Sequence, residues 1–381
     1  MKRIMKNSAV QSLLASLACI IVGLLIGYIV LLFINPAGAW DAILTVIKNF
    51  FYYPSKPAAL KYFGSTLVKT VPLMLCGLSV LFAYKVGLFN IGAAGQYVAG
   101  AGAALYLALA LNQPWYVCVI GAMLAGAMLG AISGALKSYC NVNEVISCIM
   151  LNWISLYVVN MILTTVKETT SPYTFTLSST NPAALIPSLG LGKLFSNNQY
   201  VTIALPIAIL VSILIWVLLE KTKFGYELRA TGSNKNAAKY CGMNEKRNII
   251  LTMVIAGALA GLGAALLFLT GFEQWQCSQS SVPTMGFNGI AAAFLGGLNP
   301  IGNIYFIQHI TNGGAYVDKT MYCAQISDLI SAIIIYLCGF VAFFKYFINN
   351  CIDRSEERKA HKKAAEDAAE KAGAIKEGGN K

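Results

Sequence analysis

The sequence has few charged residues. Asp, Glu, Lys and Arg make up 12% of its 381 residues, whereas soluble domains carry about 25%. Hydrophobic residues reach 57% and lie in long blocks, which excludes a soluble enzyme, a disordered chain, a coiled coil and a DNA-binding protein. The net charge of +12 would suit a nucleic-acid partner, but in so apolar a chain the position of the charges relative to the blocks matters more.

Motifs for metal, thiol and nucleotide chemistry are also missing. The ten cysteines are scattered with no C-x-x-C pair, and the two histidines, His309 and His361, lie far apart. We therefore predict no metal site and no cofactor, and interpret the cysteines as small packing residues. No G-x-x-x-x-G-K-[ST] motif occurs, so the chain has no P-loop of its own, and no nucleophile–base motif indicates an enzyme.

Nine apolar blocks are long enough to cross a bilayer, whose core of about 30 Å needs roughly 20 residues per helix. They cover residues 12–34, 66–84, 91–111, 115–136, 145–165, 200–220, 249–270, 286–310 and 323–347. The block at 286–310 is interrupted by Gly296-Gly297-Leu298-Asn299-Pro300. We predict an all-α fold, a polytopic membrane protein of about 8–10 transmembrane helices, formed by residues 1–350 and followed by a charged cytoplasmic tail, residues 351–381.

The distribution of Lys and Arg predicts a cytoplasmic N-terminus. With that orientation the inner segments hold twelve basic residues and the outer segments five, which is the bias that cytoplasmic loops show. Lys2, Arg3 and Lys6 before the first block resemble the start of a signal peptide, but the apolar run of about 23 residues exceeds an h-region of roughly 7–15. We therefore expect an uncleaved first span.

A short pattern recurs at half the length of the chain. Residues 89–94 (FNIGAA) return in form as residues 287–292 (FNGIAA), and we predict two related halves. Gly and Asn at a membrane boundary allow unwound backbone, which membranes tolerate only where protein or a cavity covers it. Paired interruptions of this kind point to a transport pathway, so we expect broken helices at both copies.

Polar residues inside the blocks are candidates for that pathway. Glu144, Cys148, Asn152 and Ser155 fall on one helical face, which indicates either a pathway lining or interhelical hydrogen bonds and a helix N-terminal carboxylate. Asn90 and Gln96 flank the first break and would hydrogen-bond either substrate or freed backbone groups.

Lys69, four residues into the second block, is interpreted as snorkelling to the outer interface.

The longest charged connection, residues 221–248, carries seven basic and two acidic residues. Within it, Ala237, Ala238 and Tyr240 predict a short helix that ends at Gly242. Residues 231–234 would turn into that helix, with Ser233 or Asn234 as its cap. Such a helix at the membrane surface suits either a cytoplasmic partner or a simple interfacial position.

Four motifs follow one another along the chain. They are VGLFNIGAAGQ (86–96), NEVIS continuing to MLNW (143–153), LRATG with AA and YCG (228–242), and GFNGIA followed by NPIG (286–302). Together they resemble the permeases of ABC importers of the ribose, branched-chain amino acid and nucleoside group. The second and fourth look most like the nucleoside (basic membrane protein-associated) branch.

The resemblance implies a membrane-spanning permease subunit that moves a nucleoside or similar small polar solute into the cell. It implies three partners besides the lipid bilayer: a cytoplasmic ATP-binding subunit that binds the ATP, a second permease subunit, and an extracellular substrate-binding lipoprotein; no nucleic acid is expected. The residues it assigns to the translocation pathway are Asn90, Gln96, Asn143, Glu144, Asn152, Trp153, Phe287 and Asn288. Those it assigns to ATPase coupling are Gly225, Arg229, Gly232, Ala237, Ala238, Tyr240 and Gly242.

Two departures and two alternatives accompany this interpretation. Ala94 stands where the family often has Glu, and Asn288 where Asp is common. A sugar or branched-chain amino acid ABC permease would share most of the motifs. An ion-coupled secondary transporter with broken helices would explain the repeat without any ATPase, although the motif at 228–242 speaks against it.

Overall fold

Helices, most of them apolar, make up the larger part of the structure, which is a computed structural model. It describes residues 8–53, 55–295, 317, 321–323 and 326–340, with positions 343, 344, 346, 347 and 350. Several predicted features lie outside the described residues: Lys2, Arg3 and Lys6, the interruption at 296–300, the remainder of the block to 310, and the tail at 351–381.

The helices follow the predicted blocks closely. The long ones are α2 (Ser8–Ile34), α4 (Lys56–Lys85), α6 (Trp115–Cys140), α7 (Glu144–Leu163), α10 (Ala204–Lys221) and α13 (Glu245–Phe268). The shorter ones are α3 (Ala39–Lys48), α5 (Ala93–Leu109), α8 (Leu177–Thr180), α9 (Leu191–Leu194), α11 (Lys223–Ser233), α12 (Lys235–Tyr240), α14 (Met285–Leu295) and α16 (Ile326–Cys338). Single 3₁₀ turns lie at Asn49–Tyr52, Thr164–Val166 and Pro182–Ala184.

Six of the described helices are long and apolar enough to cross a membrane, so the predicted multi-pass, all-α class is confirmed. Most of the long helices match their blocks to within a few residues at each end, but α4 begins ten residues before its block, at Lys56 instead of residue 66. In contrast, α5 has 17 residues, fewer than the predicted block at 91–111, because residues 91–92 and 110–111 are not helical.

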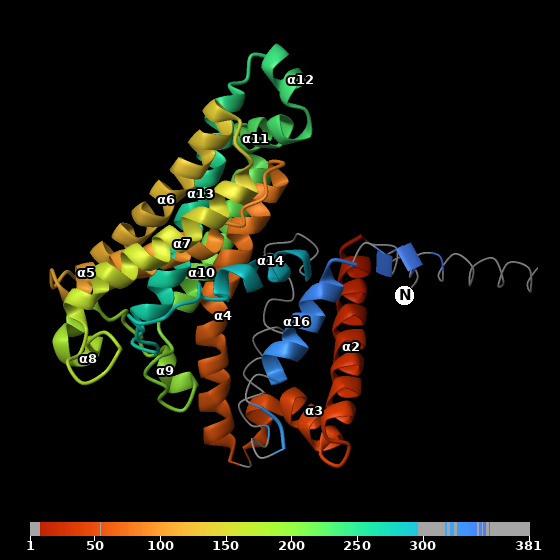
Figure 1. Cartoon of the computed structure of the whole chain (residues 1–381), viewed down its shortest axis with the longest axis vertical. Helices are drawn as coiled ribbons and strands as arrows, with labels where there is room; N and C mark the ends of the chain where they lie inside the picture. Colours follow the sequence, from red (N-terminus) through yellow and green to blue (C-terminus); the bar gives the residue numbers. More distant parts are fainter. Residues whose placement is uncertain are drawn as a thin grey trace, which may run out of the picture.

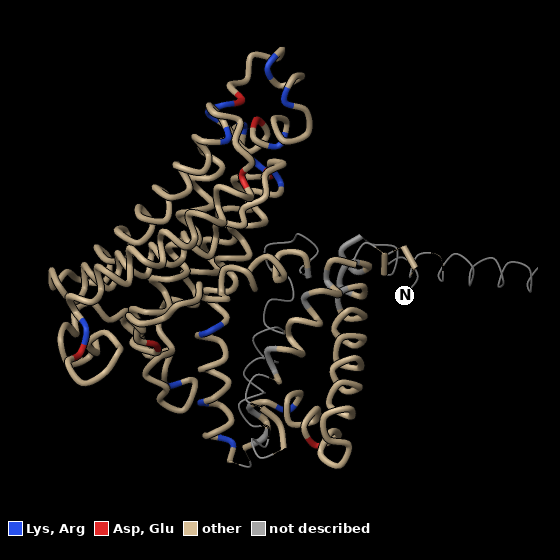
Figure 2. The backbone as a smooth tube through the Cα atoms, in the orientation of Figure 1, with Lys and Arg blue, Asp and Glu red and all other residues tan. Residues whose placement is uncertain are grey.

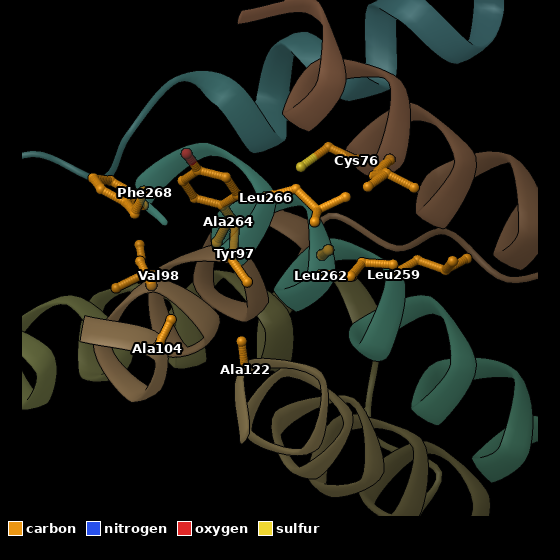
Figure 3. Close-up of a cluster of buried hydrophobic side chains, with 14 of the residues drawn as sticks. Cys76, Tyr97, Val98, Ala104, Ala122, Leu259, Leu262, Ala264, Leu266 and Phe268 are labelled. Atoms are coloured by element: carbon orange, nitrogen blue, oxygen red, sulfur yellow. The ribbon is translucent and has the colours of Figure 1, made fainter. Parts of the chain in front are cut away.

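Two central helices hold the bundle together. Most residues of α4 and α13 are buried, whereas only 28–33% of the apolar windows of α2, α6, α7 and α10 are. The main core gathers aromatic and aliphatic side chains from α4, α5, α6 and α13, including Tyr97 and Phe268 (Figure 3). The surrounding helices expose apolar faces, as expected of a surface in contact with lipid.

Glycines let α6 and α13 touch along their backbones. A side chain on Gly257 would overlap the carbonyl oxygen of Gly126, and one on Gly261 would overlap the carbonyl of Ala122. Gly130 faces the carbonyl of Met253 in the same way. The four-residue spacing of small residues in both helices therefore serves close interhelical packing.

A second core joins the ends of the sequence. It is formed by α2, α3, α14 and α16, with Leu73 of α4 linking it to the rest of the bundle. The hydroxyl of Tyr322 donates to the carbonyl of Asn35 at 2.6 Å, which ties the segment before α16 to the loop after α2. In Figure 1, α2, α3 and α16 lie to one side of α4, with the other long helices on its opposite side.

Charged side chains gather at the two ends of the bundle. Lys and Arg cluster around α11 and α12 at one end, and further basic residues lie along the opposite part of α4 (Figure 2). All segments predicted to be cytoplasmic that the structure describes, at Lys85, Lys137 and residues 221–248, fall at the α11–α12 end. The separation matches the predicted alternation of the helices.

Candidate functional site

The break between α4 and α5, residues 86–92, contains the first four residues of the first copy of the repeat and is unwound, as predicted. Gly87 has a φ of +75°, a conformation that favours glycine. A side chain on Gly87 would meet Gly232 of α11, and one on Gly232 would meet the backbone of Val86 and Gly87. The break is therefore anchored directly against the charged segment at 221–248.

Asn90 and Gln96 pair with each other inside the protein. The Asn90 Nδ2 donates to Gln96 Oε1 and to Ser79 Oγ, both at 2.9 Å, and Gln96 Nε2 donates to Asn90 Oδ1 at 3.3 Å. Ser79 in turn donates to the carbonyl of Ala256 in α13 at 2.6 Å. Asn90 has no exposed surface and Gln96 has 2%. A solute would have to open this pair to reach either side chain.

The polar face of α7 meets the first turn of α5. Asn152 Oδ1 accepts from the backbone N–H of Gly95 at 2.8 Å, and its Nδ2 donates to the carbonyl of Ile91 at 3.2 Å. Ser155 Oγ donates to the carbonyl of Gly95 at 2.9 Å. Helix N-termini leave such N–H groups without a helical partner, so Asn152 caps α5 from a neighbouring helix. Of the two roles predicted for this face, interhelical hydrogen bonding is therefore the one that Asn152 and Ser155 have in this conformation.

Glu144 and Asn143 lie where α7 begins. Glu144 Oε2 forms an ion pair of 2.7 Å with Lys137 Nζ in the last turn of α6, and both side chains are about four-fifths buried (18% and 19% exposed). Asn143 caps α7, because its Oδ1 accepts from the backbone N–H of Val145 at 2.9 Å. The carboxylate thus has the partner that a buried charge needs.

The two aromatic candidates lie apart from these polar contacts. Trp153 is 41% exposed and stacks on Tyr157, with ring centroids 6.1 Å apart and an interplanar angle of 25°. Phe287 is 38% exposed. Both rings are thus partly exposed, whereas the Asn90–Gln96 pair is buried.

The second copy of the repeat is helical, and the prediction that it is unwound was wrong. Residues 287–292 lie within α14, and the backbone N–H of Asn288 donates to Thr284 at 2.8 Å. Its glycines serve packing instead: a side chain on Gly289 would meet the backbone of α4, and one on Gly286 would overlap Ala94. Ala94 is fully buried there, so the carboxylate common in the family at this position would have no room.

The charged segment at 221–248 forms a helical hairpin between α10 and α13. The short helix predicted around Ala237 and Ala238 is α12, and Asn234 is its cap, since its Oδ1 accepts from the N–H of Ala237 at 3.0 Å. Gly242 ends it with a φ of +80°. The predicted turn at 231–234 was wrong except at Asn234, because α11 continues through Ser233. Tyr240 is 93% exposed at the far end of the hairpin.

The base of this hairpin is fixed to the bundle. Gly225 packs against the backbone of α10, and Asn248 of α13 donates to Thr231 Oγ1 at 2.8 Å. Arg229 Nη1 pairs with Glu220 Oε2 at 2.9 Å, and about a third of each side chain is exposed (35% and 37%). Movement of α11 would therefore be transmitted to α10, α13 and, through Gly232, to the break before α5.

Sequence reasoning missed a cavity at the opposite end of the bundle. Its volume is 410 Å³, and it lies between the ends of α5 and α13, the start of α10 and the segment leading into α8. Glu273 lines the cavity, and its Oε1 pairs with Lys69 Nζ at 3.1 Å. Lys69, which was predicted to snorkel to the outer interface, therefore has an ion-pair partner within the protein. Glu273 is the one charged residue between positions 248 and 294. Because a lysine inside an apolar block needs an acidic partner, this isolated carboxylate was the sequence signal for the pair.

Among the described residues, no group of three or more His, Cys, Asp and Glu side chains is placed to hold a metal ion. The polar contacts instead tie helices together, and the charges lie at the ends. This arrangement of apolar helices, a buried helix break and a charged helical hairpin is that of a multi-pass membrane protein.

The chain belongs to the family described as branched-chain amino acid transport system / permease component, whose profile matches residues 62–339. It is 34% identical over 296 residues to the guanosine ABC transporter permease protein NupP of Bacillus subtilis, covering 76% of this chain and 81% of that protein. Its identity to the nucleoside ABC transporter permease protein NupB of Lactococcus lactis is also 34%, over 309 residues, 78% of this chain and 82% of that protein.

A sugar permease is more distant. The glucose ABC transporter permease protein TsgB13 of Haloferax volcanii is 28% identical over 297 residues, 74% of this chain and 78% of that protein. No solved structure matches the chain. The family resemblance found in the four motifs is thus confirmed, and the chain is a permease component of a transport system.

Proposed function

We propose that this chain is the permease subunit of an ABC importer that carries nucleosides into the cell. One observation supports the solute class above all: the relatives with 34% identity over about three quarters of the chain are guanosine and nucleoside permeases, and the glucose permease stands at 28%. A sugar or branched-chain amino acid as solute is the alternative within the same family.

On this proposal, ATP is bound and hydrolysed by a separate cytoplasmic subunit that docks on the α11–α12 hairpin. The exposed Tyr240 and the basic residues around it suit a protein surface of opposite charge. Docking at the hairpin would act on the pathway because α11 contacts the break before α5 at Gly87 and Gly232. A second permease subunit and an extracellular substrate-binding lipoprotein would complete the importer.

We keep the proposed role of the candidate pathway residues and add that some of them must first release hydrogen bonds within the protein. Asn90, Gln96 and Asn152 are bonded to protein groups here, so solute contact requires these bonds to exchange. ATP-driven tilting of α5 against α7 would open them, since Asn152 and Ser155 hold the start of α5. Asn143, Glu144, Trp153, Phe287 and Asn288, at the start of α7 or within α7 and α14, remain pathway candidates under this proposal.

Uptake by the reconstituted importer tests the proposal. We expect proteoliposomes that contain this chain, its ATPase and a second permease to accumulate labelled guanosine and uridine when ATP and the loaded receptor are supplied. Glucose and leucine should not compete. Uptake driven by an ion gradient without ATP would instead support a secondary transporter, and competition by glucose or leucine would reassign the solute.

The proposed orientation, with the N-terminus in the cytoplasm, predicts a labelling pattern for exposed cysteines. Cys140 and Cys241 lie at the α11–α12 end, whereas Cys323 lies at the other end, and all three are exposed. We expect a membrane-impermeant maleimide to label Cys323 in intact cells, and Cys140 and Cys241 only after permeabilisation, as read by peptide mass mapping.

Cys277 serves as an internal control for that experiment. It lies on the outer side in the same orientation, but burial raises the pKa of its thiol, so it stays protonated at neutral pH and should label slowly. Labelling of Cys140 or Cys241 in intact cells, with Cys323 protected, would reverse the orientation.

A further inference from the structure

The cavity beside Glu273 has the size and form of a small-molecule site. Its 410 Å³ falls in the range of roughly 300–1,000 Å³ found for ligand pockets. Its wall comes from Leu105 of α5, residues 174–178 leading into α8, Leu185, residues 199–200 before α10 and residues 270–274 after α13, so separate parts of the chain converge on it. In the proposed orientation it opens on the outer side, where solute arrives.

Three aromatic rings line this cavity. Phe272 and Tyr200 meet edge to face, with centroids 5.1 Å apart, and Phe175, in the segment before α8, also lines the cavity. Because Tyr200 contacts Phe272, the two rings support each other as a rigid aromatic wall. Flat heterocyclic rings stack on such walls whatever their substituents.

Hydrogen-bonding groups stand beside the rings. Glu273 Oε1 pairs with Lys69 Nζ at 3.1 Å, and 37% of the Glu273 side chain is exposed. A carboxylate has about four lone-pair positions, so it can accept further hydrogen bonds while the lysine stays in place. Carboxylates commonly accept from the hydroxyls of a ribose.

The ion pair also sets the charge of the site. Lys69 compensates Glu273, and its ammonium group lies 5.4 Å from the centroid of the Phe272 ring. The pair leaves acceptor atoms in the cavity with no net charge, so the cavity favours a neutral ligand over a cation or a phosphate ester.

We infer that this cavity is a binding site for a neutral nucleoside, with the base against Phe272 and Tyr200 and the ribose hydroxyls donating to Glu273. The site would receive the solute before it reaches the helix break at residues 86–92. This inference rests on the proposed function, and it adds the place and the groups by which the permease itself recognises its solute.

Direct binding to the full-length chain in lipid nanodiscs, with no partner present, tests the inference. We expect labelled uridine to bind, and Glu273→Gln to weaken its binding about tenfold, as the loss of a charge-assisted hydrogen bond predicts. Phe272→Leu should weaken it as well. Glu168→Gln is the matched control, because it makes the same charge change in an outer segment that does not line the cavity.

Competitors then define the chemistry. Unlabelled guanosine should displace uridine, whereas ribose alone and uridine monophosphate should displace it poorly. Equal displacement by ribose would overturn the role of the aromatic wall, and preferential binding of the monophosphate would overturn the neutral character of the site.

Protection of a cysteine in the cavity against labelling tests the same site without altering the Lys69–Glu273 pair. Ser178 lines the cavity, and we expect maleimide labelling of Ser178→Cys to slow when uridine is added, relative to Cys323 in the same sample. Unchanged labelling and no binding, while the complete importer still takes up nucleosides with ATP, would overturn the cavity and leave the proposed function standing. If the complete importer takes up no nucleoside in the proteoliposome assay, the proposed function itself is overturned.

Discussion

Nucleoside uptake by the complete importer should fall to background when Arg229 is replaced by glutamate, while the amount of protein in the membrane stays unchanged. The proposed ATPase interface is basic, and Arg229→Glu changes its charge by two units at the base of α11. The Arg229–Glu220 pair is about one third exposed on each side, and exposed pairs contribute at most about 1 kcal/mol to stability. The fold should therefore tolerate the substitution, and the loss should be one of coupling.

The structure provides a control that separates the two roles of Arg229. In the double variant Arg229→Glu, Glu220→Arg, an ion pair can form again with opposite polarity, but the guanidinium group is displaced from α11 to α10. We expect uptake and ATPase stimulation to remain low in this variant. Recovery to the wild-type level would show that Arg229 serves only its internal pair, and would contradict its proposed contact with the ATPase.

Lys193→Glu is a suitable comparison for charge alone, because Lys193 is exposed at the end of α9, on the opposite side of the bundle. It should leave ATP-dependent uptake unchanged. Normal uptake by Arg229→Glu itself would remove the reason for placing the ATPase at this hairpin.

We expect Gly257→Leu to eliminate most of the folded protein. Gly257 of α13 and Gly126 of α6 face each other so closely that a side chain on either would overlap the carbonyl oxygen of the other. The obstruction is backbone, which has no rotamer to change, so the two helices would have to separate. Overpacking a core typically costs about 1–3 kcal/mol even where side chains can shift, and separation of α6 from α13 would also disrupt the main core.

The yield of monodisperse protein in detergent, measured by size-exclusion chromatography, is the test for Gly257→Leu. Ala258→Leu is the matched control: it adds a similar side chain at the next residue of the same helix, which is only partly buried, and should retain the wild-type yield. A monodisperse Gly257→Leu variant with unchanged thermal stability would contradict the close packing of α6 and α13.

Local signals in the sequence were enough for α12. Asn234 as cap, the Ala-rich turn and Gly242 at the end act over a few residues, and the structure confirms each of them. The same holds for the shared face of Cys148, Asn152 and Ser155, because helical geometry alone places them together. The pattern at 287–292 was misleading, since glycine permits both an unwound segment and close helix packing.

Contacts between residues on different helices could not be predicted from such local sequence signals. The bond from Asn152 to Gly95 spans 57 residues and the pair Lys69–Glu273 spans 204, and nothing local marks one member for the other. The roles assigned to the pathway residues stay predictions for the same reason: buried amides are suited to both a solute and a neighbouring helix, and only the arrangement of α4, α5, α7 and α13 shows that Asn90, Gln96 and Asn152 are bonded to protein here.

The apolar blocks, their lengths and the basic segment at 221–248 follow from residue chemistry alone, because the cost of placing charge and open backbone in a bilayer depends on composition and spacing. The order of four motifs likewise identified the family without coordinates. Which helices touch, which glycines allow it, and where a cavity opens beside Glu273 depend on contacts between residues far apart in the chain. Those contacts join different helices, most of all α4 and α13 at the centre of the bundle, and the pattern within one helix does not determine its partner.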